Sequence, residues 1–166
     1  MNNENLVRDS AAGWYIANTA VLTDEEILAA AEEILARRLF CDGYVIDGIE
    51  SVRKYLKIKL ALQQAEVFAV VFLNTRHRVL AYEEMFHGTI DGTSVHPREV
   101  VRRCLHHNAA AVIIAHNHPS GTSEPSQADQ SITLRLKGAL ALIDVRMLDH
   151  FVVGETMYSF AEHGLL

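Results

Sequence analysis

The stretch from His116 to Asp129 constrains the fold of this chain more than any other part of the sequence. It begins at the end of an apolar run, AAAVIIAH at 109–116, which is typical of a strand covered on both faces. It ends where Ser126 and Asp129 have the spacing of a capping box that starts a helix. A strand, a loop and a helix are therefore expected in this order. If His116 and His118 lie at the end of that strand, their side chains share one face and can bind one ion.

Asp129 is the expected third ligand of that ion. Two histidines and one carboxylate leave the fourth tetrahedral position of Zn²⁺ open for water, which indicates a hydrolytic site and not a structural one. Ligand type alone does not select zinc, so an iron oxygenase with two histidines and one carboxylate stays open. A metallo-β-lactamase-like site is disfavoured, because Pro119 stands where an aspartate would be expected soon after the second histidine. An amidohydrolase barrel needs roughly 250 residues, and this chain has 166.

The predicted acid/base residue is a glutamate in the run VLAYEEMF at 79–86, which is typical of a strand. Zinc hydrolases commonly use a glutamate to accept and return the proton of the attacking water. Glu83 and Glu84 point to opposite faces of such a strand, so only one of them can face the metal, and periodicity does not decide which. An edge strand with both carboxylates in water is the alternative.

The rest of the chain alternates between helical and strand patterns, which predicts an α/β architecture. Residues 1–43 are expected to form a short helical N-terminal extension, and residues 44–166 the main domain. The predicted helices cover residues 24–38, 51–63, 97–107 and 126–142, and the predicted strands cover 67–74, 79–86, 109–116 and 145–153.

Charge and cysteine content narrow the class of protein. The net charge is −6 and the pI about 5.8, so a broad basic face for nucleic acid is not supported. Cys41 and Cys104 are the only cysteines and are far apart, which argues against a disulfide framework. The sequence has neither the pattern of a signal peptide at its start nor an apolar run as long as a membrane span. A cytoplasmic protein without a membrane segment is expected.

The spacing around the two histidines resembles the JAMM (JAB1/MPN/Mov34) motif: His-x-His, seven residues, a serine, two residues and an aspartate. More narrowly, the chain is similar to the RadC-like family over residues 44–166. Four segments carry this similarity in the same order: VHPREV at 95–100, HNHPSG at 116–121, PS at 125–126 and LDH at 148–150. Residues 1–43 are too few for the helix-hairpin-helix region of longer RadC-like proteins, which weakens any inference of DNA binding.

The resemblance implies an MPN fold, a cytidine-deaminase-like sandwich in which helices flank a mixed, mostly antiparallel sheet. It also implies one Zn²⁺ per chain, bound by His116, His118 and Asp129, and hydrolysis of a peptide or isopeptide bond in a protein or peptide substrate. By the same resemblance Glu83, five residues before Gly88, would be the acid/base, and Ser126 would stabilise the oxyanion.

Other polar residues are predicted to support the site from behind the ligands, each with a purely structural role as the alternative. These residues are His96, Arg98, Asp149 and His150. Two other functions stay open: a catalytically silent zinc-binding MPN scaffold, and a zinc phosphodiesterase associated with DNA repair or mobile elements. The N-terminal extension, with Trp14 and Tyr15, is expected to form a homodimer contact or a substrate cover.

Overall fold

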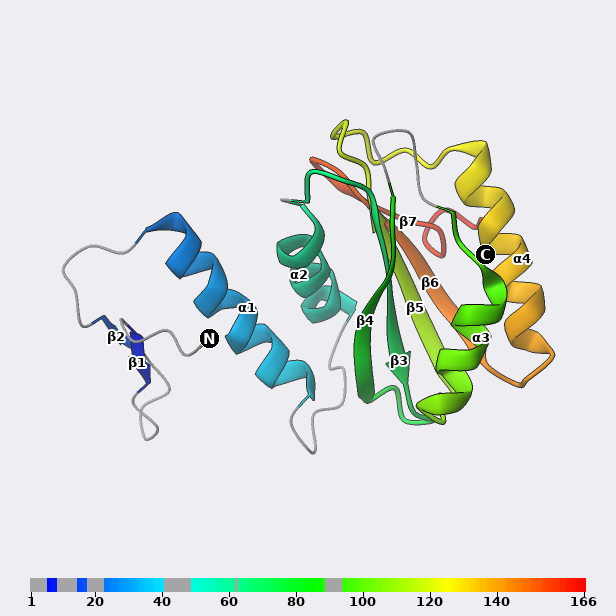
Figure 1. Ribbon diagram of the computed structural model, residues 1–166, viewed down its shortest axis with the longest axis horizontal. Helices are drawn as coiled ribbons and strands as arrows, with labels where there is room; N and C mark the ends of the chain where they lie inside the picture. The colour runs from blue at the N-terminus through cyan, green and yellow to red at the C-terminus, as the bar shows by residue number, and fades with distance from the viewer. Residues whose placement is uncertain (1–5, 9–14, 18–22, 41–48, 62, 89–93) are drawn as a thin grey trace.

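A computed structural model describes residues 6–8, 15–17, 23–40, 49–61, 63–88 and 94–166. The main body is a five-stranded sheet with strand order β4-β3-β5-β6-β7. Its strands are β3 (Val67–Leu73), β4 (Val79–His87), β5 (Ala111–Asn117), β6 (Arg146–Val153) and β7 (Met157–Ser159). The helices are α1 (Asp24–Phe40), α2 (Ile49–Leu60), α3 (Pro97–His106) and α4 (Gln127–Ala141). Helix α2 lies on one side of the sheet, and α3 and α4 lie on the other (Figure 1).

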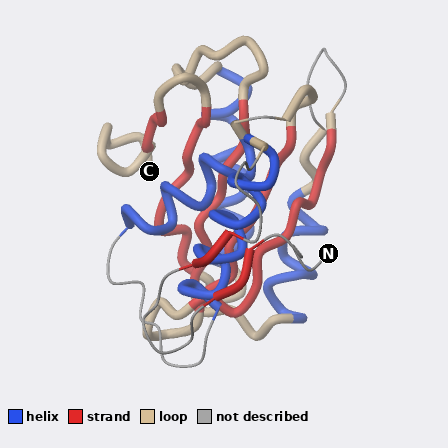
Figure 2. The backbone as a smooth tube through the Cα atoms, turned by 90° about the vertical axis from the view of Figure 1, so that its left-hand side faces the viewer, coloured by secondary structure: helices blue, strands red, loops and turns tan. Residues whose placement is uncertain are grey.

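Neighbouring strands are antiparallel except for β5 and β6, which are parallel. A parallel pair needs a crossover connection, and α4 provides it between β5 and β6. Figure 2, turned by 90°, shows the strands of the sheet side by side. The predicted α/β sandwich with a mixed, mostly antiparallel sheet is therefore confirmed.

The two faces of the sheet bury different sets of side chains, because successive residues of a strand point to opposite faces. Odd-numbered residues such as Val71 and Ile113 pack with Leu56 of α2. Even-numbered residues such as Val70 and Ile114 pack with Cys104 of α3 and Leu136 of α4. His116 has the parity of the second set, so its imidazole lies on the face that α4 covers.

Three features differ from the sequence expectations. The N-terminal extension contains strands β1 (Leu6–Arg8) and β2 (Tyr15–Ala17), which pair antiparallel, besides the expected helix α1. Strand β7 was not predicted. Leu134 and Leu142 are apolar residues of the predicted helix at 126–142, but they are 63% and 87% exposed. Positions 134 and 142 cannot share a face with 132, 136 and 140 when each residue turns the helix by about 100°.

Helix α1 packs against α2 and β4, and an ion pair between Lys59 and Glu32 joins α1 to α2. The predicted boundary between extension and main domain, at residues 43 and 44, lies outside the described residues. The division into these two domains stays a prediction. Among the helices that the structure describes, none is both long and apolar enough to cross a membrane.

Candidate metal centre

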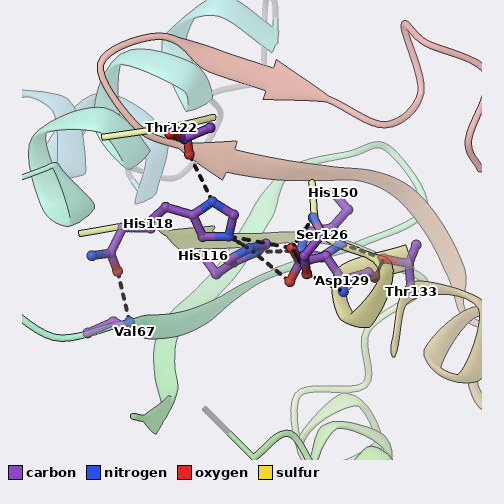
Figure 3. Close-up of polar contacts among 9 residues, drawn as sticks. Val67, His116, His118, Thr122, Ser126, Asp129, Thr133 and His150 are labelled. Atoms are coloured by element: carbon purple, nitrogen blue, oxygen red, sulfur yellow. Dashed lines mark hydrogen bonds and ion pairs between the residues drawn. The ribbon is translucent and has the colours of Figure 1, made fainter. Parts of the chain in front are cut away.

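His116, His118 and Asp129 converge at the end of β5, as Figure 3 shows. The Nε2 atoms of the two histidines lie 3.0 Å apart. Asp129 Oδ1 lies 3.2 Å from Nε2 of His116, and Asp129 Oδ2 lies 3.4 Å from Nε2 of His118. Strand β5 supplies the first histidine, the loop after it the second, and the first turn of α4 the aspartate.

Each of these three side chains directs a hydrogen-bond acceptor towards the other two. His118 Nδ1 lies 2.8 Å from the Thr122 carbonyl, which can only accept, so this nitrogen carries the proton of the neutral ring. Nδ1 of His116 contacts the buried ring of His150, and its Nε2 faces the carboxylate. Because the two Nε2 atoms and the carboxylate of Asp129 lie so near to one another, they favour a positive charge between them.

The spacing fits a divalent metal ion. Zinc bonds of about 2.0–2.1 Å in tetrahedral geometry place ligand atoms roughly 3.4 Å apart, and the three distances here are 3.0, 3.2 and 3.4 Å. Two histidines and one carboxylate are also the donor set of catalytic zinc sites, in which a fourth position is open to water or substrate. The residues present therefore fit a catalytic zinc ion in geometry and in chemistry.

The contacts among these side chains also shift the pKa values of His118 and Asp129. The hydrogen bond to Asp129 raises the pKa of His118 against partial burial, and the Thr122 carbonyl and the charges of Asp129 and Glu66 act in the same direction. Burial alone would raise the pKa of Asp129, but the hydrogen bonds with His116 and His118 outweigh it and hold this pKa well below its usual range. An environment that favours an added proton at His118 also favours a metal cation there.

The start of α4 holds Asp129 in place. Ser126 Oγ accepts a hydrogen bond from the Asp129 backbone N–H at 3.1 Å, and Asp129 Oδ2 accepts one from the Ser126 backbone N–H at 2.7 Å. The Ser126 hydroxyl also donates to Asp129 Oδ2 at 2.6 Å. The predicted capping box is therefore present and fixes the ligand carboxylate. The role of Ser126 towards an oxyanion stays a prediction.

Close packing between two loops fixes the loop that carries His118. The His118 backbone N–H donates to the Val153 carbonyl, and the Glu155 N–H donates to the Gly121 carbonyl. Gly121 has φ of +84°, and a Cβ on Gly154 would lie only 2.2 Å from the Gly121 carbonyl oxygen. A side chain at position 154 would therefore separate the two loops.

The structure does not bring Glu83 to the metal ligands. Its residue partner on β3 is Val70, whereas the partner of His116 on β3 is Phe68. Since β4 and β5 lie on opposite sides of β3, these positions are two strands and two residues apart, or roughly 12 Å. The Glu83 carboxylate instead binds Arg103 of α3 and His107. This placement argues against the acid/base role predicted for Glu83.

Glu84 is not at the centre either. It accepts a hydrogen bond from Tyr82 at 3.2 Å and is paired with Ala69, on the face that α2 covers.

Replacing Glu83 with glutamine is expected to lower the free energy of unfolding at pH 7 by about 1–2 kcal/mol, because a partly buried carboxylate loses its charged partners. The hydrogen bond from Arg103 lowers the pKa of Glu83 to about 2, against partial burial that raises it and with help from His107. A carboxylate with a lowered pKa stabilises the fold above its ordinary pKa of 4.5 and loses this effect as the pH falls towards 2. Urea unfolding should therefore show a difference between wild type and variant that shrinks from pH 5 to pH 3, and a difference independent of pH would contradict the assignment.

Glu66 is the carboxylate that the structure does bring to the centre. In the antiparallel pairing of β3 with β5, Phe68 is opposite His116, so continuing the register by two residues sets Glu66 opposite His118. Such opposite side chains have Cβ atoms about 5 Å apart on one face. Glu66, His116, His118 and Asp129 all line one cleft of about 1210 Å³.

Sequence reasoning missed Glu66. The signal available was its position immediately before the buried strand, with the same parity as Phe68. This signal becomes informative only when β5 is known to be the neighbour of β3.

Asn117 holds the backbone on both sides of Glu66. Its Oδ1 accepts a hydrogen bond from the Val67 N–H at 2.8 Å, and its Nδ2 donates to the carbonyls of Gln63 and Ala65 at 3.3 and 3.1 Å. The residue between the two histidines therefore points to the other face and fastens the segment that carries Glu66. Its side chain is buried.

The four residues predicted to support the site have different positions. His150 contacts His116 directly, with 2.9 Å between Nε2 and Nδ1. Asp149 instead accepts hydrogen bonds from the Ser159 hydroxyl and from the backbone of Ala161, so it anchors the C-terminal segment. His96 lines the cleft and its ring packs against that of Phe86. Arg98 is exposed and does not line the cleft.

Comparison with known proteins gives one family. Residues 46–165 match the RadC-like JAB domain. The UPF0758 protein of Thioalkalivibrio sulfidiphilus is 60% identical over 124 residues, which is 75% of this chain and 56% of that protein. The UPF0758 protein of Nitrosococcus oceani is 61% identical over 126 residues, again 75% of this chain and 56% of the relative.

A further relative is covered almost completely. The UPF0758 protein of Vibrio cholerae is 52% identical over 143 residues, which is 86% of this chain and 90% of that protein. The first two relatives are longer, and this chain spans little more than half of their length. The fold is consistent with these matches, and the chain belongs to the RadC-like JAB domain family, a branch of the JAMM/MPN proteins.

Proposed function

We propose that this protein is a zinc-dependent hydrolase of the JAMM metallopeptidase type that cleaves an amide bond in a peptide or isopeptide. The observation that carries the proposal is the convergence of His116, His118 and Asp129 in one cleft with Glu66. A zinc ion bound by these ligands would act as a Lewis acid and lower the pKa of a water molecule towards roughly 7.

Glu66 is the residue that handles the proton in this proposal. It accepts a proton from the attacking water while the water oxygen bonds to the carbonyl carbon of the substrate. It then passes the proton to the amine nitrogen as the carbon–nitrogen bond breaks. A positioned general acid/base of this kind contributes about 10²- to 10⁴-fold to the rate. The backbone of Glu66 is suited to this role because Asn117 fixes the residues on both sides of it.

The walls of the cleft suggest how a chain-like substrate lies there. One wall is the start of α4, with Asp129, Ile132 and Arg135 spaced by three residues along one side of the helix. The segment 94–96 before α3 also lines the cleft. A cleft of about 1210 Å³ that is open to solvent has room for several residues of an extended peptide.

The test is a cleavage assay on the zinc-loaded full chain with a peptide library that includes amide bonds to lysine side chains. Mass spectrometry should detect cleavage that a chelator stops and added Zn²⁺ restores. If the protein binds one zinc ion per chain and leaves every amide intact, hydrolysis is excluded for these substrates and a silent scaffold is favoured. Metal-dependent nicking of DNA without peptide cleavage would favour a phosphodiesterase instead.

A further inference from the structure

A continuous set of buried polar contacts lies behind His116 (Figure 3). The Thr133 hydroxyl lies 2.6 Å from the backbone carbonyl of Asp129 and 2.6 Å from Nδ1 of His150. Nε2 of His150 lies 2.9 Å from Nδ1 of His116. The side chains of His116, Thr133 and His150 are at most 1% exposed, so water does not compete for these contacts.

The chemistry of each group gives the direction of every hydrogen bond. A backbone carbonyl only accepts, so the Thr133 hydroxyl donates its one hydrogen to the Asp129 carbonyl. The Thr133 oxygen must then accept from Nδ1–H of His150. His150 is neutral, because burial in an apolar setting disfavours the charged ring, and its Nε2 is therefore an acceptor. The donor in the last contact must be Nδ1–H of His116.

The proton on Nδ1 determines the state of the other ring nitrogen of His116, Nε2. A neutral imidazole with its proton on Nδ1 has a lone pair on Nε2, and Nε2 is the atom that faces Asp129 and His118. The opposite tautomer would direct an N–H at the position of the metal. The directions of these hydrogen bonds, which follow from the accepting carbonyl of Asp129, therefore determine whether His116 can act as a ligand.

Packing keeps the ring of His150 in the required orientation. Phe160 stacks on it with ring centroids 4.7 Å apart, and Phe68 meets it edge-on at 5.9 Å. His150 lies on β6, Thr133 on α4 and His116 on β5. The three contacts thus connect the two elements that carry the His116 and Asp129 ligands.

We propose that Thr133 and His150 are positioning residues for the metal, which hold His116 in the Nδ1–H tautomer and present its Nε2 to the ion. This inference rests on the metal site of the proposed function, though not on the reaction that occurs there. Removing a residue that orients a ligand in this way typically weakens metal binding about 10- to 100-fold.

The test compares Thr133→Val with Thr133→Ser. Valine has the shape of threonine without the hydroxyl, so His150 Nδ1–H loses its acceptor and the tautomer of His116 is no longer determined. Serine keeps the hydroxyl and should keep both the tautomer and the affinity. In metal-free protein at pH 8, ¹⁵N NMR of the histidine rings should show Nδ1–H for His116 and His150 in wild type and Thr133→Ser, and a mixture in Thr133→Val.

Competition with a chromophoric chelator should then give an affinity for Zn²⁺ about 10- to 100-fold lower for Thr133→Val than for Thr133→Ser. Thermal unfolding of the metal-free proteins shows whether both variants are folded. Wild-type rings with the proton on Nε2 overturn the proposal even if a variant does not fold, and so does a folded Thr133→Val with unchanged tautomers and affinity. Failure of the hydrolase proposal would instead appear as zinc binding without cleavage, which leaves the tautomers and the affinities intact.

Discussion

Replacing His118 with alanine is expected to abolish the binding of one zinc ion per chain. His118 supplies one of the three protein ligand atoms that converge at the centre. This atom is Nε2, because Nδ1 is hydrogen-bonded to the Thr122 carbonyl. Apparent binding free energies of about 10–16 kcal/mol for structural zinc with four ligands correspond to roughly 2.5–4 kcal/mol for each ligand, or about 60- to 700-fold in affinity. Elemental analysis after dialysis against a weak chelator measures the loss.

His106→Ala is the matched control for this experiment. His106 is an exposed histidine in the last turn of α3 and is not one of the metal ligands. Zinc should raise the midpoint of thermal unfolding of wild type and of His106→Ala, because a ligand that binds only the folded state stabilises it, and should not raise that of His118→Ala. A His118→Ala protein that keeps one zinc ion per chain would show that the metal lies elsewhere.

Replacing Glu66 with glutamine is expected to keep zinc and to lower the rate of amide cleavage by about 10²- to 10⁴-fold. Glutamine has nearly the same shape as glutamate but cannot accept the proton of the attacking water at neutral pH. Glu66 is not among the predicted metal ligands, so metal content should not change. The measurement is kcat on the best substrate from the peptide library, with zinc content determined on the same sample.

Glu83→Gln is the control because it makes the same substitution on a neighbouring strand. Its carboxylate is bound by Arg103 and His107, so the variant should be less stable but should keep its turnover at a temperature where it is folded. The opposite result, with Glu83→Gln inactive and Glu66→Gln active, would restore the role that the family resemblance implied for Glu83. The pair of variants therefore decides between the two carboxylates.

Much of the candidate centre was predictable because it is local in sequence. His116 and His118 are separated by one residue at the end of an apolar run, and period two alone sets them on one face. Ser126 and Asp129 have the spacing of a capping box, which depends only on the first turn of a helix, and the structure contains it. Helices α2, α3 and α4 and strands β3 to β6 were predictable for the same reason, whereas β7 was not predicted.

The acid/base residue could not be found in this way. Glu83 lies within strand β4, and Glu66 directly precedes strand β3; both strands are rich in apolar residues. Both glutamates are on the face of the sheet that α3 and α4 cover. They differ in register. Glu83 pairs with Val70 of β3, two residues beyond the Phe68 that is opposite His116, whereas Glu66 is at the level of His118. Strand pairing joins residues about 50 positions apart, and short-range periodicity carries no information about it.

Local sequence patterns were enough to predict the three candidate metal ligands, the helix that presents Asp129 and the family to which the chain is similar. Each of these depends on residues that are close together in the sequence. The carboxylate that lines the cleft, and the buried groups behind His116, became visible in the folded structure alone. Glu66, Thr133 and His150 approach the ligands through strand register and through the crossover of α4 from β5 to β6. Those contacts are formed by packing of the whole sheet, where side chains distant in sequence become neighbours on one face.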